Sequence, residues 1–495
     1  MKKISYILAL FLFVNILAGC SKKNNDDPIV NPTNTVSIDN PINNFVWKGM
    51  NSWYNWQSNV SNLADTKDDN PESYATYLNK YSTPEDLFNS LLFDAGNTDR
   101  FSWFIQDYVE QQKQFQGISL SFGFRLQGVK INANGDIILY VRYVSNNSPA
   151  FDAGIKRGDI INAIDGVVLN ETNYNNTVSK LSNDTVTLSF VTENNGALTS
   201  AGDKTITATE VSDNPVYLTK VFDNINGQKV GYLVYNGFRS SYNDELNAAF
   251  ADLKAAGINE LILDLRLNGG GSVETSTYLA SMIDGSTTTS DKFAELKFNS
   301  KHTNENSTYT FQDTQNDYDV TGAKTGEESI NKLTTLSRLY VLTSHSTASA
   351  SEMIINGLKP YMSVKVIGTT TYGKNVGSIT LYDSPSSDYT SQSSANPNHK
   401  NAMQPIVFQI FNKLEQSDYT QGFTPDIEVV EYEYWNNILP FGDENEVVLK
   451  AALDDIRGIS AKSSSIKDKN ISPLKVLPLE NKFDKEMYIT NDFLN

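Results

Sequence analysis

The chain has 495 residues, of which 39% are hydrophobic and 11% aromatic, and its formal net charge is −18. This length suffices for two or three domains with sizeable cores, and the composition excludes an intrinsically disordered chain. The negative charge argues against nucleic-acid binding, because nonspecific contacts to phosphates need clustered Lys and Arg. We therefore expect folded, acidic domains with no nucleic-acid partner.

The first 20 residues have the pattern of an export signal. Lys2 and Lys3 precede an apolar run from Ile4 to Leu17, which falls short of the roughly 20 apolar residues of a membrane-spanning helix. Residues 17–20, Leu-Ala-Gly-Cys, resemble the lipobox of bacterial lipoproteins, in which the cysteine becomes the lipidated first residue. This resemblance predicts a signal peptide over 1–19 and a lipid anchor at Cys20. An ordinary signal with an incidental cysteine is the alternative.

The predicted anchor places the protein in the bacterial cell envelope, lipid-anchored to a membrane and facing the periplasm or the cell surface. Cys20 is the single cysteine, so no intrachain disulfide can form. Residues 20–44 comprise this cysteine and a polar stretch without periodicity, which predicts a flexible tether.

Residues 45–115 are predicted to form a small helical domain. Val46, Trp47, Met50 and Trp53 recur at three- and four-residue spacing, which is typical of an amphipathic helix. Thr83, followed by proline and glutamate, is a strong helix-start signal. An aromatic stripe of this kind more often packs into a core than binds a cofactor.

Residues 116–210 change to alternating, β-branched runs separated by Asn-Gly and Asp-Gly turns, which predicts strands. Within them, residues 148–150 (SPA), 153–161 (AGIKRGDII) and 164–166 (IDG) resemble the central signature of bacterial PDZ domains. In such domains, a glycine-containing loop binds a peptide's terminal carboxylate while the peptide adds a strand to the sheet edge. Phe122, Gly123 and Phe124 occupy the corresponding place. The bland alternative is a strand bend.

Residues 215–460 are predicted to form an α/β core. A strand at 229–234, a helix ending at Gly257 and a strand at 261–265 indicate a βαβ unit with parallel strands. Strands at 338–343 and 363–368 flank a further predicted helix at about 349–358. Residues 461–495 are polar and poorly periodic and are interpreted as a C-terminal tail.

Ser349 lies between an apolar strand and a helix, where free backbone N–H groups and the helix dipole favour a developing oxyanion. The same Ser-x-x-Glu pattern, ending at Glu352, is also that of a capping box that only fixes the helix start. A serine hydroxyl needs a base to act as a nucleophile. His302 and His399 lie in polar stretches, and no orienting carboxylate accompanies His345.

Lysine can replace histidine as the base if burial lowers its pKa from about 10.4 toward 7 or 8. Lys374 follows an apolar strand and lies among glycines beside Tyr372 and Val376. Alone, it would be interpreted as a surface charge.

Four segments together resemble the C-terminal processing peptidases, or tail-specific proteases. They are Ser346–Glu352, Gly373–Lys374 with its lysine 25 residues after Ser349, Leu263–Gly271, and Gly422–Val429. The resemblance implies a multidomain α+β protein with a helical N-terminal domain, a PDZ domain and a ClpP/crotonase-like α/β protease core. It implies that Ser349 is the nucleophile, Lys374 the base, and the N–H groups of Gly270 and Ala350 the oxyanion hole. Its expected activity is that of a serine endopeptidase acting on exported polypeptides, with substrate segments recognised by the PDZ domain.

The chain departs from the family pattern at two positions. Relatives often have Asn-Pro-Gly-Gly where this chain has Asn268 followed by Gly269, Gly270 and Gly271. Four residues after the lysine, a glutamine that orients the amine is often found, and here Ser378 takes that place.

Two alternatives remain. Residues 368–374 fit the first seven places of a phosphate-binding loop, but Asn375 replaces the hydroxyl residue that holds magnesium. The second alternative is a catalytically weak peptide-binding protein built on a protease scaffold. No cluster has recognisable metal-ligand spacing, so we expect no metal or cofactor. The oligomeric state stays open.

Overall fold

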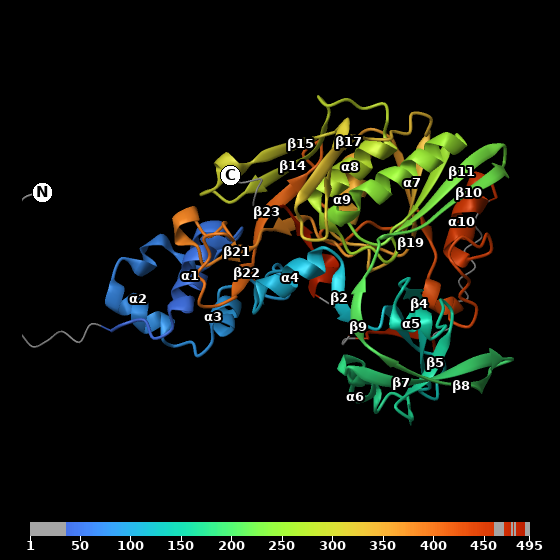
Figure 1. Cartoon of the computed structure of the whole chain (residues 1–495), viewed down its shortest axis with the longest axis horizontal. Coiled ribbons are helices and arrows are strands. Elements are labelled where there is room, and N and C mark those ends of the chain that lie inside the picture. Colours follow the sequence, from blue (N-terminus) through green and yellow to red (C-terminus); the bar gives the residue numbers. More distant parts are fainter. Residues whose placement is uncertain (1–35, 460–469, 477–478, 480–481, 491–495) are drawn as a thin grey trace, which may run out of the picture.

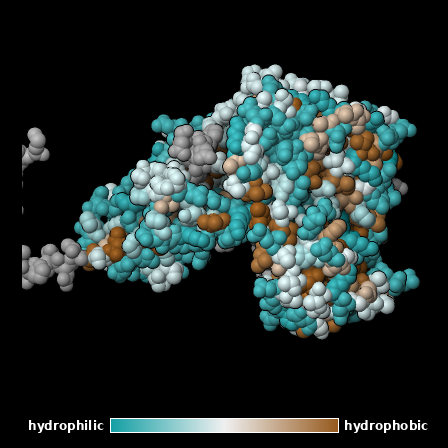
Figure 2. Space-filling view, viewed as in Figure 1, coloured by the Kyte–Doolittle hydropathy of each residue, from teal (hydrophilic) through white to brown (hydrophobic). Residues whose placement is uncertain are grey.

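A computed structural model describes residues 36–459, 470–476, 479 and 482–490. The predicted signal peptide, Cys20 and most of the tether lie outside these residues. In Figure 1, the chain forms a helical region at one end, and the PDZ-like sheet and the helix-covered core lie at the other. The exposed surface in Figure 2 is mostly hydrophilic, with apolar residues in small groups.

Three helices of the N-terminal region begin in the same way. α1 (Pro41–Trp53), α2 (Pro71–Leu78) and α3 (Pro84–Ser90) each follow an Asn or Thr whose side chain accepts a backbone N–H, and each has proline at its first turn. The apolar face of α1 is buried in the same hydrophobic cluster as residues of β11 (Gln228–Tyr235), β12 (Glu260–Asp264) and β18 (Arg338–Thr343), strands of the core. The helical region is therefore packed onto the core as well as linked to it by the chain.

A small sheet strengthens this attachment. β1 (Trp103–Ile105) pairs with β22 (Ala402–Gln404), which pairs with β21 (Leu381–Tyr382). From β1, the chain passes through α4 (Tyr108–Phe115) into the next domain. Strands this short carry no periodicity that could reveal them in the sequence.

The PDZ domain has its own hydrophobic cluster. Its sheet runs in the order β25 (Ser472–Leu474), β3 (Phe124–Lys130), β4 (Ile137–Val144), β5 (Ile160–Ile164), β7 (Thr185–Asn194) and β8 (Ala197–Thr207), with β6 (Val167–Val168) beside β5. β2 (Ile118–Ser121) and β9 (Thr209–Ser212) pair at the entry and exit of the domain. The short helices α5 (Pro149–Asp152) and α6 (Tyr174–Val178) complete it. A strand of the C-terminal region, β25, thus closes one edge.

The core is built on a sheet in the order β10 (Val216–Ile225), β11 (Gln228–Tyr235), β12 (Glu260–Asp264), β18 (Arg338–Thr343), β19 (Ser363–Gly368) and β24 (Ile427–Glu428). All neighbours from β11 to β24 are parallel. α7 (Asn243–Ala256) and α9 (Ala350–Leu358) are the crossover helices, as predicted, and α8 (Val273–Ile283) packs beside α9. α10 (Val447–Ile456) covers the other face.

A second sheet of the core has the order β13 (Gly271–Ser272), β26 (Met487–Tyr488), β20 (Val376–Ser378), β23 (Ile406–Phe411), β14 (Lys292–Phe298) and β15 (Ser307–Thr310). The hairpin of β16 (Thr314–Tyr318) and β17 (Lys324–Ser329) follows β15. β26 comes from residues 461–495, which the sequence indicated only as a polar tail. Its two residues lie between β13 and β20.

Candidate active site

Ser349 occupies the turn between β18 and α9, where parallel βαβ units place functional loops. Its backbone has φ 65° and ψ −118°, a conformation that is costly for a residue with a Cβ and that clusters at functional sites. The side chain is fully buried, and Oγ has no hydrogen-bond partner within the described part of the chain. An unpaired buried hydroxyl next to a helix N-terminus is suited to attack a substrate.

The glycine loop after β12 lies directly against this serine. A Cβ built on Gly270 would stand 2.7 Å from Ser349 Cβ and 3.0 Å from Ala350 N, and the φ of Gly270 is 118°. Only glycine permits this approach. The structure thus brings together the three residues predicted to form the nucleophile and oxyanion hole.

The two predicted oxyanion N–H groups are not equally available. Ala350 N–H is the first of α9, a position with no intrahelical acceptor and at the positive end of the dipole. Gly270 N–H donates to Asn268 Oδ1 at 2.9 Å. Gly270 must therefore exchange this bond before it can serve an oxyanion.

Lys374 is fully buried, as a lysine base requires. Its Nζ donates to the carbonyl of Lys485 at 2.9 Å and lies 3.3 Å from Glu486 Oε2, with the Phe101 ring 4.9 Å away. Burial lowers the pKa of Lys374 below its usual value, and the nearby Glu486 carboxylate opposes that shift.

Ser378 has no direct bond to Lys374 among the described contacts. Its Oγ bonds Glu486 Oε2 at 2.9 Å and accepts from Gln404 Nε2 at 2.9 Å, while Trp103 Nε1 donates to Glu486 Oε1 at 3.0 Å. The side chain that reaches Lys374 is therefore Glu486, held by Ser378 and Trp103. Glu486 was missed because the polar stretch around it has no motif.

Glu352 joins the two halves of the site. Its Oε2 accepts the backbone N–H of Ser349 at 2.9 Å and that of Lys374 at 2.8 Å. Its Oε1 accepts from Gly373 N at 2.7 Å and from Thr371 Oγ1 at 2.5 Å. Burial raises the pKa of Glu352 to about 7 despite these donors. The pattern Ser-x-x-Glu drew attention to this residue, but only as a helix cap.

Three stretches of the chain match known families. Residues 41–103 match the peptidase S41 N-terminal domain, 112–191 the PDZ domain, and 229–429 peptidase family S41. The chain therefore contains an S41 N-terminal domain, a PDZ domain and a peptidase S41 domain. The family and the fold class predicted from the sequence are thereby confirmed.

Curated relatives resemble this chain over part of their length. A carboxyl-terminal-processing protease of Picosynechococcus sp. is 26% identical over 268 residues, covering 53% of this chain and 58% of the relative. A protein of Staphylococcus aureus (strain MRSA252) named as a CtpA-like serine protease is 24% identical over 315 residues, covering 60% and 57%. The chain thus spans less than two thirds of each of these relatives.

A solved structure matches more completely. The crystal structure of a protein from Bacteroides fragilis classed as an S41 protease superposes with a TM-score of 0.65 at 28% identity, covering 84% of this chain and 98% of that one. The arrangement of helical region, PDZ domain and core is therefore that of an S41 protease.

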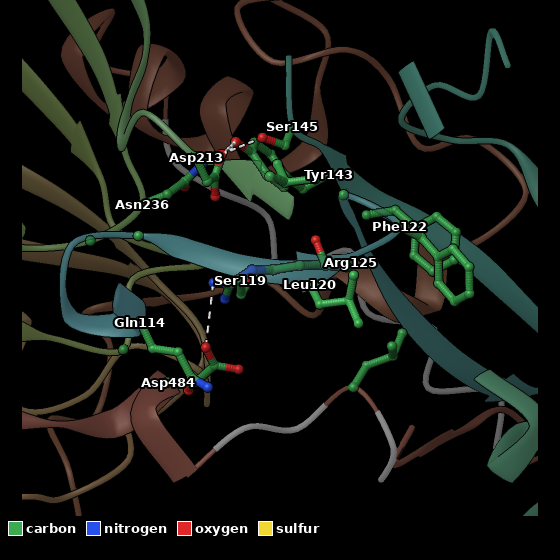
Figure 3. Close-up of a pocket in the computed structure, with 18 of the residues that line it drawn as sticks. Gln114, Ser119, Leu120, Phe122, Arg125, Tyr143, Ser145, Asp213, Asn236 and Asp484 are labelled. Atoms are coloured by element: carbon green, nitrogen blue, oxygen red, sulfur yellow. Dashed lines mark hydrogen bonds and ion pairs between the residues drawn. The ribbon is translucent and has the colours of Figure 1, made fainter. Parts of the chain in front are cut away.

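The predicted peptide-binding loop lines a cavity of about 490 Å³ that extends to the glycine loop (Figure 3). Gly123 has φ 80°, and a Cβ there would overlap the side chain of Ser148. The rings of Phe122 and Phe124 are buried and stacked, with centroids 5.6 Å apart. The structure thus places the PDZ loop and the predicted oxyanion loop on one cavity.

The histidines lie in other surroundings. His302 stacks on Trp53 with ring centroids 3.6 Å apart, and His399 Nε2 lies 3.1 Å from Asp383 Oδ2. His345 packs near the ring of Tyr372. The segment after Lys374 forms β20, where a phosphate-binding loop would require a helix. Among the described residues, no group of His, Cys, Asp or Glu is arranged to hold a metal ion.

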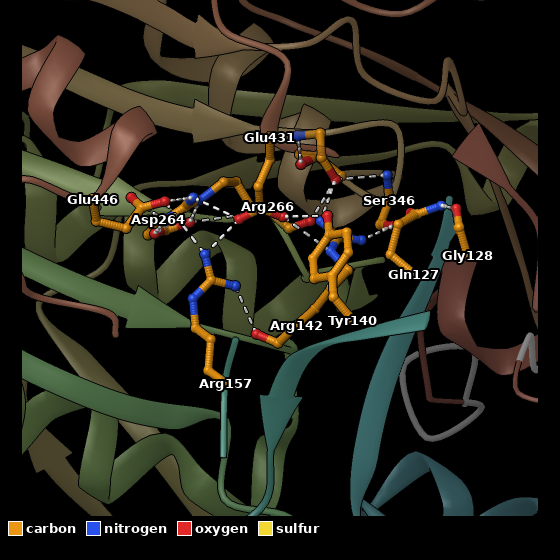
Figure 4. A network of polar contacts seen from close by, with 12 residues as sticks. Gln127, Gly128, Tyr140, Arg142, Arg157, Asp264, Arg266, Ser346, Glu431 and Glu446 are labelled. Atoms are coloured by element: carbon orange, nitrogen blue, oxygen red, sulfur yellow. Dashed lines mark hydrogen bonds and ion pairs between the residues drawn. The ribbon is translucent and has the colours of Figure 1, made fainter. Parts of the chain in front are cut away.

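A buried ion cluster connects the PDZ domain to the core (Figure 4). Two arginines of the PDZ domain contact Glu431. Arg157 lies 2.5 Å from its Oε1, and Arg142 lies 3.2 Å from its Oε2. Arg266 of the core bonds Asp264, Glu431 and Glu446. Since Arg266 lies shortly before the glycine loop, the cluster fixes the PDZ domain close to the predicted catalytic residues.

Proposed function

We propose that this S41 peptidase is a serine endopeptidase that hydrolyses peptide bonds with a Ser349–Lys374 dyad. Neutral Lys374 accepts the Ser349 hydroxyl proton as Oγ attacks the scissile carbonyl carbon. The N–H of Ala350, with that of Gly270 once released from Asn268, stabilises the oxyanion. The lysine ammonium then protonates the leaving amine, and water attacks the acyl-enzyme with Lys374 again as base.

The observation that carries this proposal is the shared Glu352 oxygen. It accepts the N–H groups of Ser349 and Lys374 at once, which fixes the nucleophile and base segments side by side within a buried pocket. If Ser349 were only a helix cap and Lys374 only a surface charge, their backbone N–H groups would not be expected to share one buried acceptor.

The proposal is tested by cleavage of an unfolded protein by the purified chain, followed by gel electrophoresis and mass spectrometry. Ser349→Ala and Lys374→Met should each lower the rate by about 10³-fold or more, as loss of a triad or dyad member does. Ser393→Ala and Lys80→Ala, at exposed positions, are the matched controls and should retain the full rate. Equal rates in all five proteins would exclude the dyad.

We further propose that the PDZ domain captures substrates, often by their C-terminal ends, through the loop at Phe122, Gly123 and Phe124. The cavity that joins this loop to Gly270 supports this role. If the loop binds the terminal carboxylate, a peptide with a free C-terminus should bind more tightly than the same peptide with an amidated C-terminus. Binding of peptides without any turnover in the wild-type chain would instead favour a peptide-binding protein on a protease scaffold.

We also propose that Cys20 is lipidated and anchors the protein in the bacterial cell envelope, facing the periplasm or the surface. The support is the sequence of residues 1–20, which lies outside the described structure. No helix among the described residues is long and apolar enough to cross a membrane. Incorporation of an alkyne-tagged fatty acid, lost in Cys20→Ala, is the test. Equal labelling of both proteins would refute the anchor.

A further inference from the structure

Residues 484–490 run directly past the catalytic dyad. The carbonyl of Lys485 accepts from Lys374 Nζ, and the carbonyl of Glu486 accepts from Gly271 N–H at 2.6 Å. Met487 and Tyr488 then pair with β13, and Tyr488 also pairs with Ser378 of β20. Extended peptides bind proteins by adding a strand to exposed edges in this manner. The segment therefore makes main-chain contacts of the kind that a bound substrate would make.

The segment also divides a cleft. A cavity of about 490 Å³ reaches from the PDZ loop to the glycine loop, and a second of about 470 Å³ reaches residues 344–346, just before the nucleophile. Arg125, Leu479 and Asp484 line both, and Arg125 and Asp484 form an ion pair at 3.7 Å (Figure 3). Removing the segment would join the two cavities beside the dyad.

No substrate can reach the dyad while the segment is in place. Ser349 and Lys374 are both fully buried, and Glu486, Met487 and Tyr488 are themselves buried against them and their neighbours. The Glu486 carboxylate also stands beside the lysine and favours its charged form, which cannot accept a proton. Access and base strength are both reduced by the same residues.

The two positions where this chain departs from the family pattern both accommodate the segment. A Cβ on Gly269, where relatives often have proline, would overlap the carbonyl oxygen of Asp484. Ser378, where a glutamine is often found, bonds Glu486 Oε2. A larger residue at 269 is incompatible with the observed path of the segment, so the sequence of the core is matched to this occupant.

We propose that residues 484–490 are an internal pseudo-substrate, which occupies the peptide cleft between β13 and β20 in the resting chain and must leave before substrate binds. This inference rests on the proposed protease function. It defines the cleft as a site for an extended peptide strand and makes the resting enzyme latent.

The test releases the segment in two independent ways. One variant ends at Val476, which keeps β25, and the other is Gly269→Ala at full length, in which the added Cβ displaces the segment. Gly326→Ala, at a half-buried position of the β16–β17 hairpin with an ordinary φ and room for a Cβ, is the matched control. Two rates are measured, namely cleavage of an unfolded protein and labelling of Ser349 by a fluorophosphonate, whose phosphorus bonds Oγ as fluoride leaves.

Both released variants should be labelled and should cleave faster than the full-length chain, by on the order of tenfold if the resting population is mostly closed. A synthetic peptide of residues 482–490, KFDKEMYIT, should inhibit the chain that ends at Val476, and a version with glutamine at position 486 should inhibit it less.

Equal labelling of the full-length and released chains, together with no inhibition by the peptide, would overturn the inference while leaving the protease intact. Loss of labelling in a Gly269→Ala chain that melts at the wild-type temperature would also overturn it, because the segment would then complete the site. Absence of labelling and cleavage in every form would instead refute the proposed protease activity.

Discussion

Lys374 must be neutral to act as a base, and its surroundings shift its pKa in opposite directions. Burial lowers the pKa and is the larger cause, whereas Glu486 raises it. We expect kcat/KM to rise with pH along a limb whose apparent pKa lies below the usual lysine value of about 10.4. Replacing the carboxylate in Glu486→Gln removes the opposing charge and should move this limb to lower pH. The measurement is the pH profile of kcat/KM for both proteins. A limb at the same pH in both would contradict the effect of Glu486 on the pKa of Lys374.

Lys374 also makes a signed contribution to stability. Its folded-state pKa lies below its unfolded value, so between these two values the unfolded chain binds more protons, and the contribution of this group to stability rises with pH. The unfolding free energy of the wild type minus that of Lys374→Met should therefore rise with pH between the folded and unfolded pKa values of Lys374.

Glu352 gives the opposite sign. Its pKa of about 7 in the folded chain, against an ordinary 4.5, means that the folded chain binds more protons between these values. Its contribution to stability therefore falls as pH rises through this window, by about 3 kcal/mol in total. Glu352→Gln cannot ionise, and urea unfolding from pH 4.5 to 7.5 should lack this fall. The exposed substitution Glu72→Gln should keep it.

The same substitution should impair catalysis. The amide that Glu352→Gln introduces would turn its N–H donors toward two of the four groups that now donate to the carboxylate. The donors left without an acceptor would be those of Ser349 and Lys374, or those of Thr371 and Gly373. Leaving a buried donor unpaired costs about 1–3 kcal/mol of stability. We expect a lower kcat in cleavage assays with a smaller effect on KM. Unchanged kcat would show that Glu352 is only a cap.

At this scale, the sequence predicted the residues that carry motifs. Ser349, Ala350 and Gly270 do meet, and Lys374 is buried. Glu486 could not be predicted, because its contact with Lys374 joins positions 112 residues apart and no local pattern encodes such a contact. A role of Ser378 in orienting the lysine amine, at the place where relatives often have glutamine, stays a prediction, and the observed bond of its hydroxyl is to Glu486.

Among the elements, those with strong periodicity were predictable. The two βαβ units appear where apolar runs alternate with amphipathic stretches. β1, β13 and β26 were not predicted, because strands of two or three residues form only when neighbours supply the pairing partners. Such pairings decide how the N-terminal and C-terminal regions attach to the core.

α9 offers a prediction in which two effects compete. Gly357→Ala should stabilise an isolated helix by about 1 kcal/mol. In this fold, however, the added Cβ would overlap the ring of Phe293 on β14, which is fully buried. Overpacking a core costs about 1–3 kcal/mol, so we expect net destabilisation.

Chemical denaturation measures this change, and Gly326→Ala, where the structure leaves room for a Cβ, serves as the control. Because α9 begins at Ala350, a shift of the helix away from β14 should also reduce the cleavage rate. A Gly357→Ala protein more stable than the wild type would mean that Phe293 on β14 moves aside with little loss of packing energy.

On the scale of the whole molecule, a buried ion cluster contributes to holding the PDZ domain against the core (Figure 4). Arg157 contacts Glu431 and Glu446, donates to the carbonyl of Leu439 at 2.9 Å and stacks over Phe441. Arg157→Met would keep much of the apolar contact but leave buried carboxylates with fewer partners. Breaking a buried pair in this way costs about 3–5 kcal/mol.

Lys130→Met provides the contrast within the same domain. Lys130 pairs with Glu171 at the surface, where side chains are 24% and 55% exposed, and such pairs contribute only about 0–1 kcal/mol. Urea unfolding should therefore separate the two variants clearly, and small-angle scattering of Arg157→Met should show a larger radius of gyration as the PDZ domain detaches. Arg142 of that domain reaches Ser344 and Ser346 at 3.5 Å, so detachment should also slow cleavage. A compact, fully active Arg157→Met protein would show that the hydrophobic contacts between domains hold them together without the charges.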